Sequence, residues 1–404
     1  MDNASRKKKV LIVWGNWGPY HYARFRGFKS ACERAGLEAI GLQLFQKSNI
    51  YDWESTESEA GIRNFSFGDR EMDFPVWKCL TQLLPYLWKI RVDYAFVPSY
   101  WHWSLFINFV CRIRGAKIIM MNESHADTEK ADGIKRWIKK QIVKRFHAAL
   151  LGGKPHQRHF ANLGMKPESL FTGYDAIDVD FFSKKADIVR VNAETERKRL
   201  NLPARYILSL SRMVEKKNLP RLVEAYAQMI SPDNGTVPHL AFVGSGPLEE
   251  EVRQKVADLG LPIFDHTDSR EVETVTQSAK GVHFYGFRQI DDNPAFFTLA
   301  EAFIMPSLWE EWGLVVNEAM ACSTPVLVAE NAGCAEDLVV EGETGYTFDP
   351  RDTASITRSM EKLLVNRKLS SHMGEAGLRH VLEYDCAGFG RNAIRAIEYV
   401  DSLS

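Results

Sequence analysis

The sequence predicts an α/β fold made of two doubly wound domains, each with a parallel β-sheet between layers of helices. The chain has 404 residues, which is long for one hydrophobic core and divides naturally into two domains of about 200 residues each. Short apolar segments alternate with helical segments along the whole chain, and this alternation is typical of parallel sheets. The clearest unit is residues 302–329, where an apolar strand, a loop, a helix and a second apolar strand follow one another.

Composition indicates a globular protein and excludes several other classes. Hydrophobic residues make up 45% of the chain and its formal net charge is −1, so no bulk charge attracts nucleic acid. The six cysteines include no C-x-x-C pair, which favours reduced thiols in a cytoplasmic protein. The apolar residues 10–14 are too few for a signal sequence, and no segment is as long as a membrane-spanning helix.

The first domain is expected over residues 1–183 and begins with a buried strand that runs into a glycine-rich loop. Gly15 and Gly18 would let the backbone approach a ligand at the sheet edge, although a turn needed only for packing would use the same residues. Further strands are predicted at 37–45, 63–67, 94–97, 118–121, 148–151 and 169–176. Helices are predicted between them, among them 23–35, 77–90 and 103–114.

A second candidate loop of this domain follows the strand at 118–121. It carries Glu123 and His125 at the carboxyl edge of the predicted sheet, where open α/β proteins bind ligands. A histidine there could hydrogen-bond a ligand, but loop histidines are often exposed without a function. Both interpretations of His125 stay open.

A basic amphipathic helix is predicted at 134–146. One face is apolar and carries Ile134, Trp137, Ile138 and Ile142. Six cations occupy the other faces: Lys135, Arg136, Lys139, Lys140, Lys144 and Arg145. Such a helix can lie on an anionic membrane surface, or it can pack its apolar face on the core. The membrane interpretation gains slightly from four tryptophans in the same domain, Trp77, Trp88, Trp101 and Trp103.

The charged residues 184–205 lack a strand pattern and are predicted to link the two domains. The second domain is expected over 206–385. Its strands are predicted at 206–210, 240–243, 282–285, 302–306 and 326–329, and its helices at 248–259, 314–322, 353–364 and 369–382. Gly244 follows the second of these strands in a G-x-G pair, which alone is weak evidence for a ligand. Phe287 follows the third strand.

Two glutamates flank the start of the predicted helix 314–322. The helix dipole and the N–H groups of Gly313, Leu314 and Val315 would face the carboxyl edge of the sheet and favour an anion, most simply a diphosphate. Glu310 could then point toward a sugar ring, and Glu318 could accept hydrogen bonds from a ribose. Surface carboxylates without such a role are the alternative.

Positive charge is expected at the same edge of the sheet, in the loop after the strand 206–210. Arg212 and Lys217 lie five residues apart there, with Lys216 as an ambiguous neighbour. Two cations in this place would neutralise the charge of a diphosphate as its bond to a sugar breaks. Surface cations that bind no ligand are the alternative interpretation of the same residues.

These residues resemble the E-x7-E motif of retaining glycosyltransferases of family 4, which have the GT-B fold. The motif is matched by Pro306, Ser307, Glu310, Gly313, Leu314, Val315, Glu318, Ala319, Met320, Ala321 and Pro325. Arg212 and Lys217 resemble the family's second signature. Ser323 departs from the pattern, because the family usually has glycine at this helix end.

The resemblance implies two Rossmann-like domains facing a cleft, with residues 386–404 returning as a helix to the first domain. It implies a retaining transfer of a sugar from a UDP- or GDP-linked donor to a glycan, a lipid-linked acceptor or a small molecule. The catalytic residues it implies are Glu310, Arg212, Lys217 and His125. The donor-binding residues it implies are Gly15, Gly18, Gly244, Phe287, Gly313, Leu314, Val315 and Glu318.

No metal or other cofactor is expected. Asp178 and Asp180 form a D-x-D triplet like the metal site of the GT-A class, but they lie where a GT-B chain turns toward its linker. A nucleotide-sugar epimerase of the same fold is less consistent with Arg212, Lys217 and the E-x7-E motif. A non-catalytic homologue that binds a nucleotide sugar, or serves as a scaffold, is the main alternative. We expect a cytoplasmic protein, with peripheral contact at the inner face of the membrane if residues 134–146 meet a bilayer.

Overall fold

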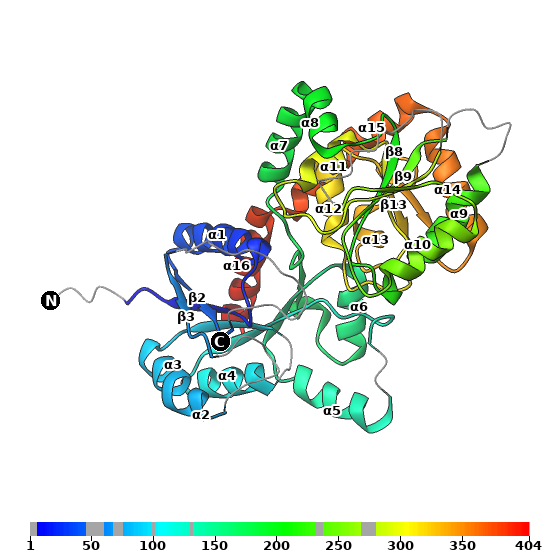
Figure 1. Ribbon diagram of the computed structural model, residues 1–404. Coiled ribbons are helices and arrows are strands. Elements are labelled where there is room, and N and C mark those ends of the chain that lie inside the picture. The colour runs from blue at the N-terminus through cyan, green and yellow to red at the C-terminus, as the bar shows by residue number, and fades with distance from the viewer. Residues whose placement is uncertain are drawn as a thin grey trace. The chain divides into compact units, whose positions relative to one another are not determined.

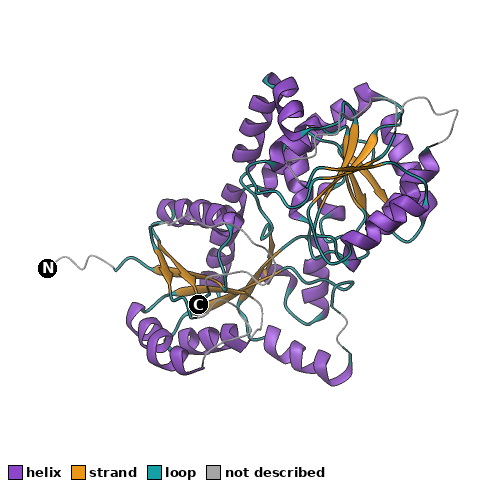
Figure 2. Cartoon of the chain, viewed as in Figure 1, coloured by secondary structure: helices purple, strands orange, loops and turns teal. Residues whose placement is uncertain are grey.

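The computed structural model describes residues 6–45, 60–67, 76–98, 102–129, 132–230, 237–267 and 280–403. The chain forms two compact units, Met1–Asp178 with Tyr384–Ser404, and Val179–Glu383. Each unit holds one seven-stranded sheet, and every described strand pairing is parallel. Helices cover both faces of each sheet (Figure 2). The predicted α/β class with two doubly wound sheets is confirmed.

The sheet of the first unit has the order β3-β2-β1-β4-β5-β6-β7. Its strands are β1 Lys9–Trp14, β2 Glu38–Gln43, β3 Ile62–Asn64, β4 Tyr94–Pro98, β5 Lys117–Asn122, β6 Ala148–Leu151 and β7 Leu170–Thr172. In register, Val10 of β1 lies opposite Ala39 of β2 on one side and Tyr94 of β4 on the other. The strand order reverses at β1, so the loop after β1 lies at the switch point where doubly wound sheets bind ligands.

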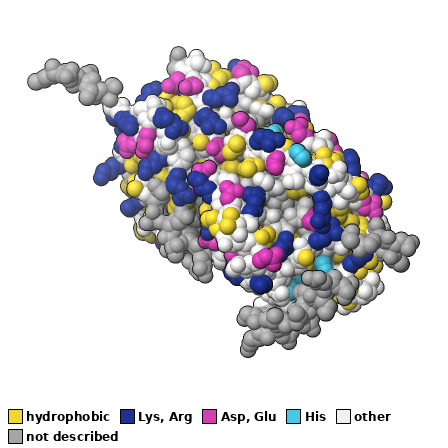
Figure 3. All heavy atoms as spheres, turned by 90° about the horizontal axis from the view of Figure 1, so that it is seen from above, with side chains coloured by type: hydrophobic (Ala, Val, Ile, Leu, Met, Phe, Trp, Pro, Cys, Tyr) yellow, Lys and Arg dark blue, Asp and Glu magenta, His cyan; other side chains and the backbone are white. Residues whose placement is uncertain are grey.

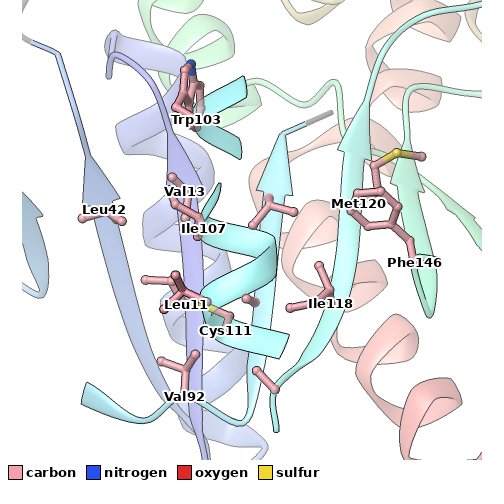
Figure 4. Close-up of a cluster of buried hydrophobic side chains, with 14 of the residues drawn as sticks. Leu11, Val13, Leu42, Val92, Trp103, Ile107, Cys111, Ile118, Met120 and Phe146 are labelled. Carbon is pink, nitrogen blue, oxygen red and sulfur yellow. The ribbon is translucent and has the colours of Figure 1, made fainter. Parts of the chain in front are cut away.

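Two layers of helices bury the two faces of this sheet (Figure 1). One layer is α1 Pro19–Arg34 with α16 Cys386–Ser402. The other is α2 Val76–Lys78, the π-helical turn η2 Cys79–Leu83, α3 Leu84–Ile90, α4 His102–Ile113, α5 Gly133–Val143 and α6 Lys154–Asn162. Alternate residues of β1 serve the two layers, because Val10 and Ile12 join one core cluster while Leu11 and Val13 join the other. Figure 4 shows Leu11 and Val13 in the second cluster, with Ile107 and Cys111 of α4.

Two elements of the first unit differ from their predicted form. The helix expected at 77–90 is interrupted by η2, which ends two residues before Pro85. Proline has no N–H to donate and its ring crowds the preceding turn, which accounts for the irregular turn. The strand expected at 169–176 is only three residues long, because the chain leaves the sheet at Gly173 with a positive φ of 93°.

Helix α5 also differs from the helix predicted at 134–146. It ends at Val143, and Phe146 is buried in the core below it. Lys139 is buried, and its ammonium group contacts Glu129 and His159. The sequence pattern predicts that Lys139 faces outward with the other cations. The structure shows that this prediction is wrong for Lys139.

The apolar residues at the start of α5 point away from the core. Ile134, Trp137 and Ile138 are 74%, 61% and 46% exposed. The alternative that α5 packs this apolar face on the core is wrong for these three residues, whereas Ile142 does pack against the core. Of the four tryptophans, Trp77 and Trp88 are exposed and Trp103 is buried, while Trp101 lies outside the described residues.

The sheet of the second unit has the order β10-β11-β9-β8-β12-β13-β14. Its strands are β8 Tyr206–Leu210, β9 His239–Val243, β10 Ile263–Asp265, β11 Val282–Phe284, β12 Ala302–Met305, β13 Val326–Ala329 and β14 Gly345–Phe348. The sequence pattern missed the two edge strands β10 and β14. The helices are α7 Val179–Val191, α8 Ala193–Leu200, α9 Leu219–Met229, α10 Glu249–Asp258, α11 Asn293–Leu299, α12 Leu314–Ala321, α13 Ala335–Leu338, α14 Thr353–Leu364 and α15 Arg367–Val381.

Residues 184–205, which were expected to form a linker, are mostly helical and belong to the second unit. Helix α7 packs against α11 and α12. Arg190 of α7 donates a hydrogen bond of 2.7 Å to the carbonyl oxygen of Cys322, at the end of α12. The high charge of residues 184–205 had indicated a linker. A helix that packs one side on its own unit and exposes the other is equally rich in charge, so composition did not separate the two.

Three histidines form a hydrogen-bonded chain through the β10-β11-β9 side of this sheet. His266 Nε2 lies 2.9 Å from His283 Nδ1, and His283 Nε2 lies 2.9 Å from His239 Nδ1. The amide nitrogen of Asn201 lies 3.2 Å from the far ring nitrogen of His266. Burial lowers the pKa of His283 to about 2, and the neighbouring rings of His239 and His266 act in the same direction. Burial also lowers the pKa values of His239 and His266.

The histidine chain predicts a loss of stability in mild acid. Because the three pKa values lie below the ordinary value near 6.5, the unfolded chain binds protons before the folded chain does as the pH falls. The stability that these neutral rings contribute is present above about pH 6.5 and is lost progressively below it. Urea unfolding followed by circular dichroism between about pH 7.5 and about pH 5 should show this decline.

Two histidine variants test whether the histidine chain causes this loss of stability. His283→Leu removes the ring to which His239 and His266 both hydrogen-bond. It should therefore cost about 2 kcal/mol or more at neutral pH and flatten the decline toward acid. His372→Asn, an exposed histidine on α15, should leave the decline unchanged. A wild-type stability that stays constant or rises toward about pH 5 would contradict the prediction.

Candidate functional site

The loops after β8 and β12 carry Arg212, Lys217, Glu310 and Gly313, and the sheet places these two loops together. These strands are neighbours in the sheet although the sequence separates them, and parallel strands end at the same edge. Leu308 in the second loop donates a backbone hydrogen bond of 2.8 Å to the carbonyl oxygen of Lys216 in the first. The two loops are thus joined directly by the backbone.

Asn218 adds a second connection that the sequence analysis missed. Its backbone is left-handed, with φ of 54°, and its buried amide donates to the carbonyl oxygens of Pro306 at 3.1 Å and Pro350 at 2.8 Å. It therefore ties the loop after β8 to the loops after β12 and β14. An asparagine directly before a helix start was the available signal, because asparagine tolerates this conformation.

The centre of the site is the carboxylate of Glu310. Lys217 contacts its Oε2, and Lys216 lies 3.0 Å from its Oε1 and 2.7 Å from Glu311. The hydroxyl of Ser307 donates to Oε2 at 3.2 Å. The sequence pattern selected Lys217 over Lys216, but both lysines reach the same carboxylate, and Ser307 had been matched to the motif without a role.

The charges in this cluster depend on one another. Burial by itself favours a neutral Glu310, but the ammonium groups of Lys217 and Lys216 outweigh burial and hold its pKa below the ordinary value. Burial likewise opposes the charge of Lys216, yet Glu310 and Glu311 raise its pKa above the ordinary value. Two lysine ammonium groups thus surround the buried Glu310 carboxylate, and one of them also reaches the more exposed Glu311.

Gly313 sets the start of α12 beside this cluster. Its φ is 108°, a region that side chains strongly disfavour. A Cβ at this position would lie 2.8 Å from Met305 and 3.5 Å from the side chain of Glu310. Glycine is therefore required where the helix begins, and Leu314 and Val315 form the first turn, as the sequence predicts.

Glu318, on the second turn of α12, is fully buried rather than open to solvent. Asn293 at the start of α11 donates to its Oε2 at 3.4 Å. The side-chain oxygen of Asn293 is itself buried and has no hydrogen-bond partner among the residues that the structure describes. The sequence analysis missed Asn293, because nothing in the spacing of α11 relates it to α12.

The loops that carry Arg212 and Gly244 are packed against each other. Met213 accepts from the backbone of Leu248 at 3.0 Å and donates to that of Ser245 at 2.8 Å. A Cβ on Gly244, whose φ is 125°, would lie 2.0 Å from the carbonyl oxygen of Ser211. Loop packing alone thus requires glycine at 244, and Arg212 is half-buried on the loop that Gly244 supports.

Phe287 lies after β11 and is 40% exposed. The preceding residue, Gly286, accepts a 2.8 Å hydrogen bond from the backbone of Gly244. The loop after β11 therefore joins the same edge of the sheet as Arg212 and Glu310. Ser323 at the end of α12 takes a left-handed φ of 57°, so the serine adopts the turn for which the family usually has glycine.

The remaining predicted residues lie in the first unit, which has a polar cluster of its own. Gly18 caps α1, and its N–H donates to His21 Nδ1 at 3.1 Å. The carbonyl oxygen of Gly15 accepts from the backbone of Phe45 at 2.8 Å. His125 is buried, so it is not the exposed loop histidine that remained an alternative.

His125 has partners that the sequence analysis missed. Its ring packs edge-on against His156 at the start of α6, with 5.2 Å between ring centroids, and its Nδ1 lies 3.8 Å from Asp127. A Cβ on Gly152 would fall 2.9 Å from Asp175 and 3.0 Å from the Nε2 of His156. The Asp175 carboxylate and the His156 ring therefore lie on the same side of Gly152.

Arg24 completes this cluster from α1. Its guanidinium donates to the carbonyl oxygen of Ala176 at 2.9 Å and lies 3.5 Å from Asp175. The available signal was Gly152-Gly153 followed closely by His156, directly after a strand. The loops after β1, β5, β6 and β7 thus bring buried polar groups to one edge of this sheet.

The D-x-D triplet has cationic partners. Asp178 lies 3.9 Å from Arg26, and Asp180 lies 2.7 Å from Lys184. Across the part of the chain that the structure describes, no group of three or more His, Cys, Asp or Glu side chains is placed to hold a metal ion. In that same part, no helix is long and apolar enough to cross a bilayer.

Sequence comparison finds relatives among sugar-transferring enzymes. Residues 191–380 match the family described as glycosyl transferases group 1. An alpha-D-kanosaminyltransferase of Streptomyces kanamyceticus is 23% identical over 288 residues, which cover 70% of this chain and 67% of that protein. A GDP-mannose-dependent alpha-(1-6)-phosphatidylinositol monomannoside mannosyltransferase of Mycolicibacterium smegmatis is 30% identical over 186 residues, which cover 44% of this chain and 43% of that protein.

Structural comparison extends over both units. The solved structure of Anabaena Alr3699/HepE in complex with UDP matches with a TM-score of 0.68 at 16% identity, and covers 97% of this chain and 99% of that protein. A likeness at this identity shows the fold. The chain therefore has the GT-B fold, and its residues 191–380, which lie in the second unit, match the glycosyl transferases group 1 family.

Proposed function

We propose that this chain is a retaining glycosyltransferase of family 4 that moves a hexose from a UDP- or GDP-linked donor to a glycan, a lipid-linked acceptor or a small molecule. The observation that carries the proposal is the contact of Lys216 and Lys217 with the Glu310 carboxylate, beside the start of α12. One relative depends on GDP-mannose and one structural neighbour binds UDP, which supports a nucleotide sugar as donor.

The cluster suits a donor diphosphate. Lys217 is paired with Glu310 in the structure, and an arriving diphosphate would offer both lysines a further anion. The half-buried Arg212 and the N–H groups at the start of α12 would add further positive potential. A shift of Lys217 toward the phosphate would leave the Glu310 carboxylate able to hydrogen-bond the sugar.

The proposed reaction keeps the donor's anomeric configuration. The acceptor hydroxyl attacks the anomeric carbon on the face from which the nucleotide diphosphate departs. The bond between the anomeric carbon and the phosphate oxygen breaks, the bond to the acceptor oxygen forms, and the departing phosphate oxygen takes the acceptor's proton. Arg212 and Lys217 stabilise the charge on the leaving diphosphate, while Glu318 and its neighbour Asn293 are assigned to the ribose.

A non-catalytic homologue that only binds a nucleotide sugar, or scaffolds a complex, is the alternative. It would keep the buried ion cluster for stability without turning over a donor. Hydrolysis of UDP- or GDP-sugars by the purified protein, without any acceptor, separates the two. Release of sugar from one donor supports the enzyme, and binding without release supports the homologue.

Replacing the cations should reduce turnover. Lys217→Ala and Arg212→Ala should each lower the rate of donor hydrolysis by about 100-fold or more, because each removes a charge that stabilises the leaving diphosphate. Release of the nucleoside diphosphate is measured directly, and circular dichroism confirms folding. Lys255→Ala is a matched control, because it breaks another lysine–glutamate pair of the same unit, that with Glu224 at 2.8 Å. Folded Lys217→Ala and Arg212→Ala proteins with wild-type rates would remove both residues from the diphosphate site.

Activity should not require a divalent metal. Arg212, Lys216, Lys217 and the start of α12 already supply the positive charge that a magnesium or manganese ion would supply elsewhere, and both D-x-D carboxylates are paired with cations. Turnover in excess EDTA should equal turnover without it. A loss in EDTA that manganese restores would show that the diphosphate is held by a metal instead.

The product should have the same anomeric configuration as the donor sugar. Proton NMR of the first product formed reads the anomeric coupling before mutarotation can occur. An inverted product would exclude the same-face mechanism and with it the assignment to the retaining family 4, even if donor turnover were confirmed.

A further inference from the structure

The outer surface of the helices from α2 to α5 is unusually apolar for an exposed face. We call these elements, with η2, the outer helical layer of the first unit. Large apolar side chains on it are between 46% and 74% exposed. They are Trp77, Leu80, Trp88, Phe109, Ile113, Ile134, Trp137 and Ile138. Only the last three belong to the helix predicted to contact a membrane.

The helices of the outer helical layer pack on the same face of the sheet. The inner sides of its helices pack into the same core cluster, through residues such as Leu83, Ile107 and Val143. The guanidinium of Arg114, at the end of α4, lies 4.4 Å from the ring centroid of Trp88 on α3. Arg112 of α4 donates to the backbone carbonyl just beyond α5, at Arg145. Figure 1 shows α2, α3, α4 and α5 on the side of the sheet opposite α1 and α16.

The charge of this layer has one sign. Helices α2 to α5 and η2 contain no aspartate or glutamate, although α1 and α16 on the other face contain both signs. The cations of the layer include Lys89, Arg112, Lys135, Arg136 and Lys140. The face seen from above in Figure 3 carries acidic and basic side chains interspersed, as most protein surfaces do.

We propose that the outer helical layer as a whole docks on an anionic phospholipid bilayer. Tryptophan is the side chain that prefers the boundary between lipid and water, and the cations on these helices, which contain no acid, are attracted to anionic headgroups. Since these helices are short and their apolar residues lie on one side, the layer lies on the membrane surface rather than crossing it. The docking surface thus extends from α5 across α4 to α2 and α3.

This inference rests on the proposed function in one respect: membrane docking would bring the enzyme to a lipid-linked acceptor. The docking itself depends on the first unit alone and is measured without any donor. Donor hydrolysis, in contrast, depends on Arg212, Lys216 and Lys217 in the second unit. Failure of one therefore leaves the other standing.

Vesicle flotation tests the proposal with the full-length protein. Vesicles of phosphatidylcholine alone should float little protein, and a rising fraction of phosphatidylglycerol should float more, with release at high salt because salt screens the attraction. The double variant Trp77→Ser/Phe109→Ser, which leaves α5 intact, and Trp137→Ser on α5 should each weaken binding roughly tenfold. Val365→Ser, an exposed apolar residue of the second unit, is the control and should bind like wild type.

Each other outcome overturns the proposal. If Trp137→Ser abolishes binding while Trp77→Ser/Phe109→Ser binds like wild type, only α5 docks. If binding is absent, or equal on neutral vesicles, the layer does not recognise an anionic bilayer. The wild-type protein could instead self-associate without lipid, and Trp77→Ser/Phe109→Ser could remove that self-association. The outer helical layer would then bind a second copy of the chain rather than a membrane. Wild-type donor hydrolysis in that double variant, in the absence of lipid, confirms that the second unit is intact.

Discussion

A buried carboxylate must be compensated, and this requirement organises the second unit. Glu310 is 7% exposed, and it stays ionised because Lys216 and Lys217, which lie 94 and 93 residues earlier in the chain, reach it from a neighbouring loop. Removing one partner of such a pair leaves an uncompensated charge, which typically costs about 3–5 kcal/mol. The two loops therefore hold one another, and Asn218 extends the connection to a third.

The first unit applies the same principle with different residues. Arg24 and Asp175 are each less than 4% exposed, and they pair beside the buried rings of His125 and His156. Both units thus gather buried polar groups at the carboxyl edge of a parallel sheet, because every strand of such a sheet ends there. The histidine chain of His239, His266 and His283 and the contact of Lys139 with Glu129 place further polar groups inside the two units.

Some residues that are candidates for the site are already required by the structure. Gly244 is required by loop packing whether or not a ligand approaches it, and Gly313 is required by its backbone conformation. Lys139 was expected to be one of the solvent-facing cations of a basic helix, but it points inward and contacts Glu129. A residue type at the right spacing therefore does not by itself separate a binding role from a packing role.

The sequence by itself determined the fold class, most of the strands and the helix start at Gly313, because apolar periodicity and glycine at a helix start act through local physics. It also brought Glu310, Arg212 and Lys217 to notice, since their spacing matches a known motif. Only the tertiary structure decided that Lys216 shares the carboxylate of Glu310, that Asn293 lies beside Glu318, and that His125, His156 and Asp175 lie together. It alone decided which tryptophans face solvent and that Lys139 is buried. These outcomes depend on contacts between segments far apart in the chain, and the free energy of such a contact is set by burial and by the partner, neither of which a local sequence pattern contains.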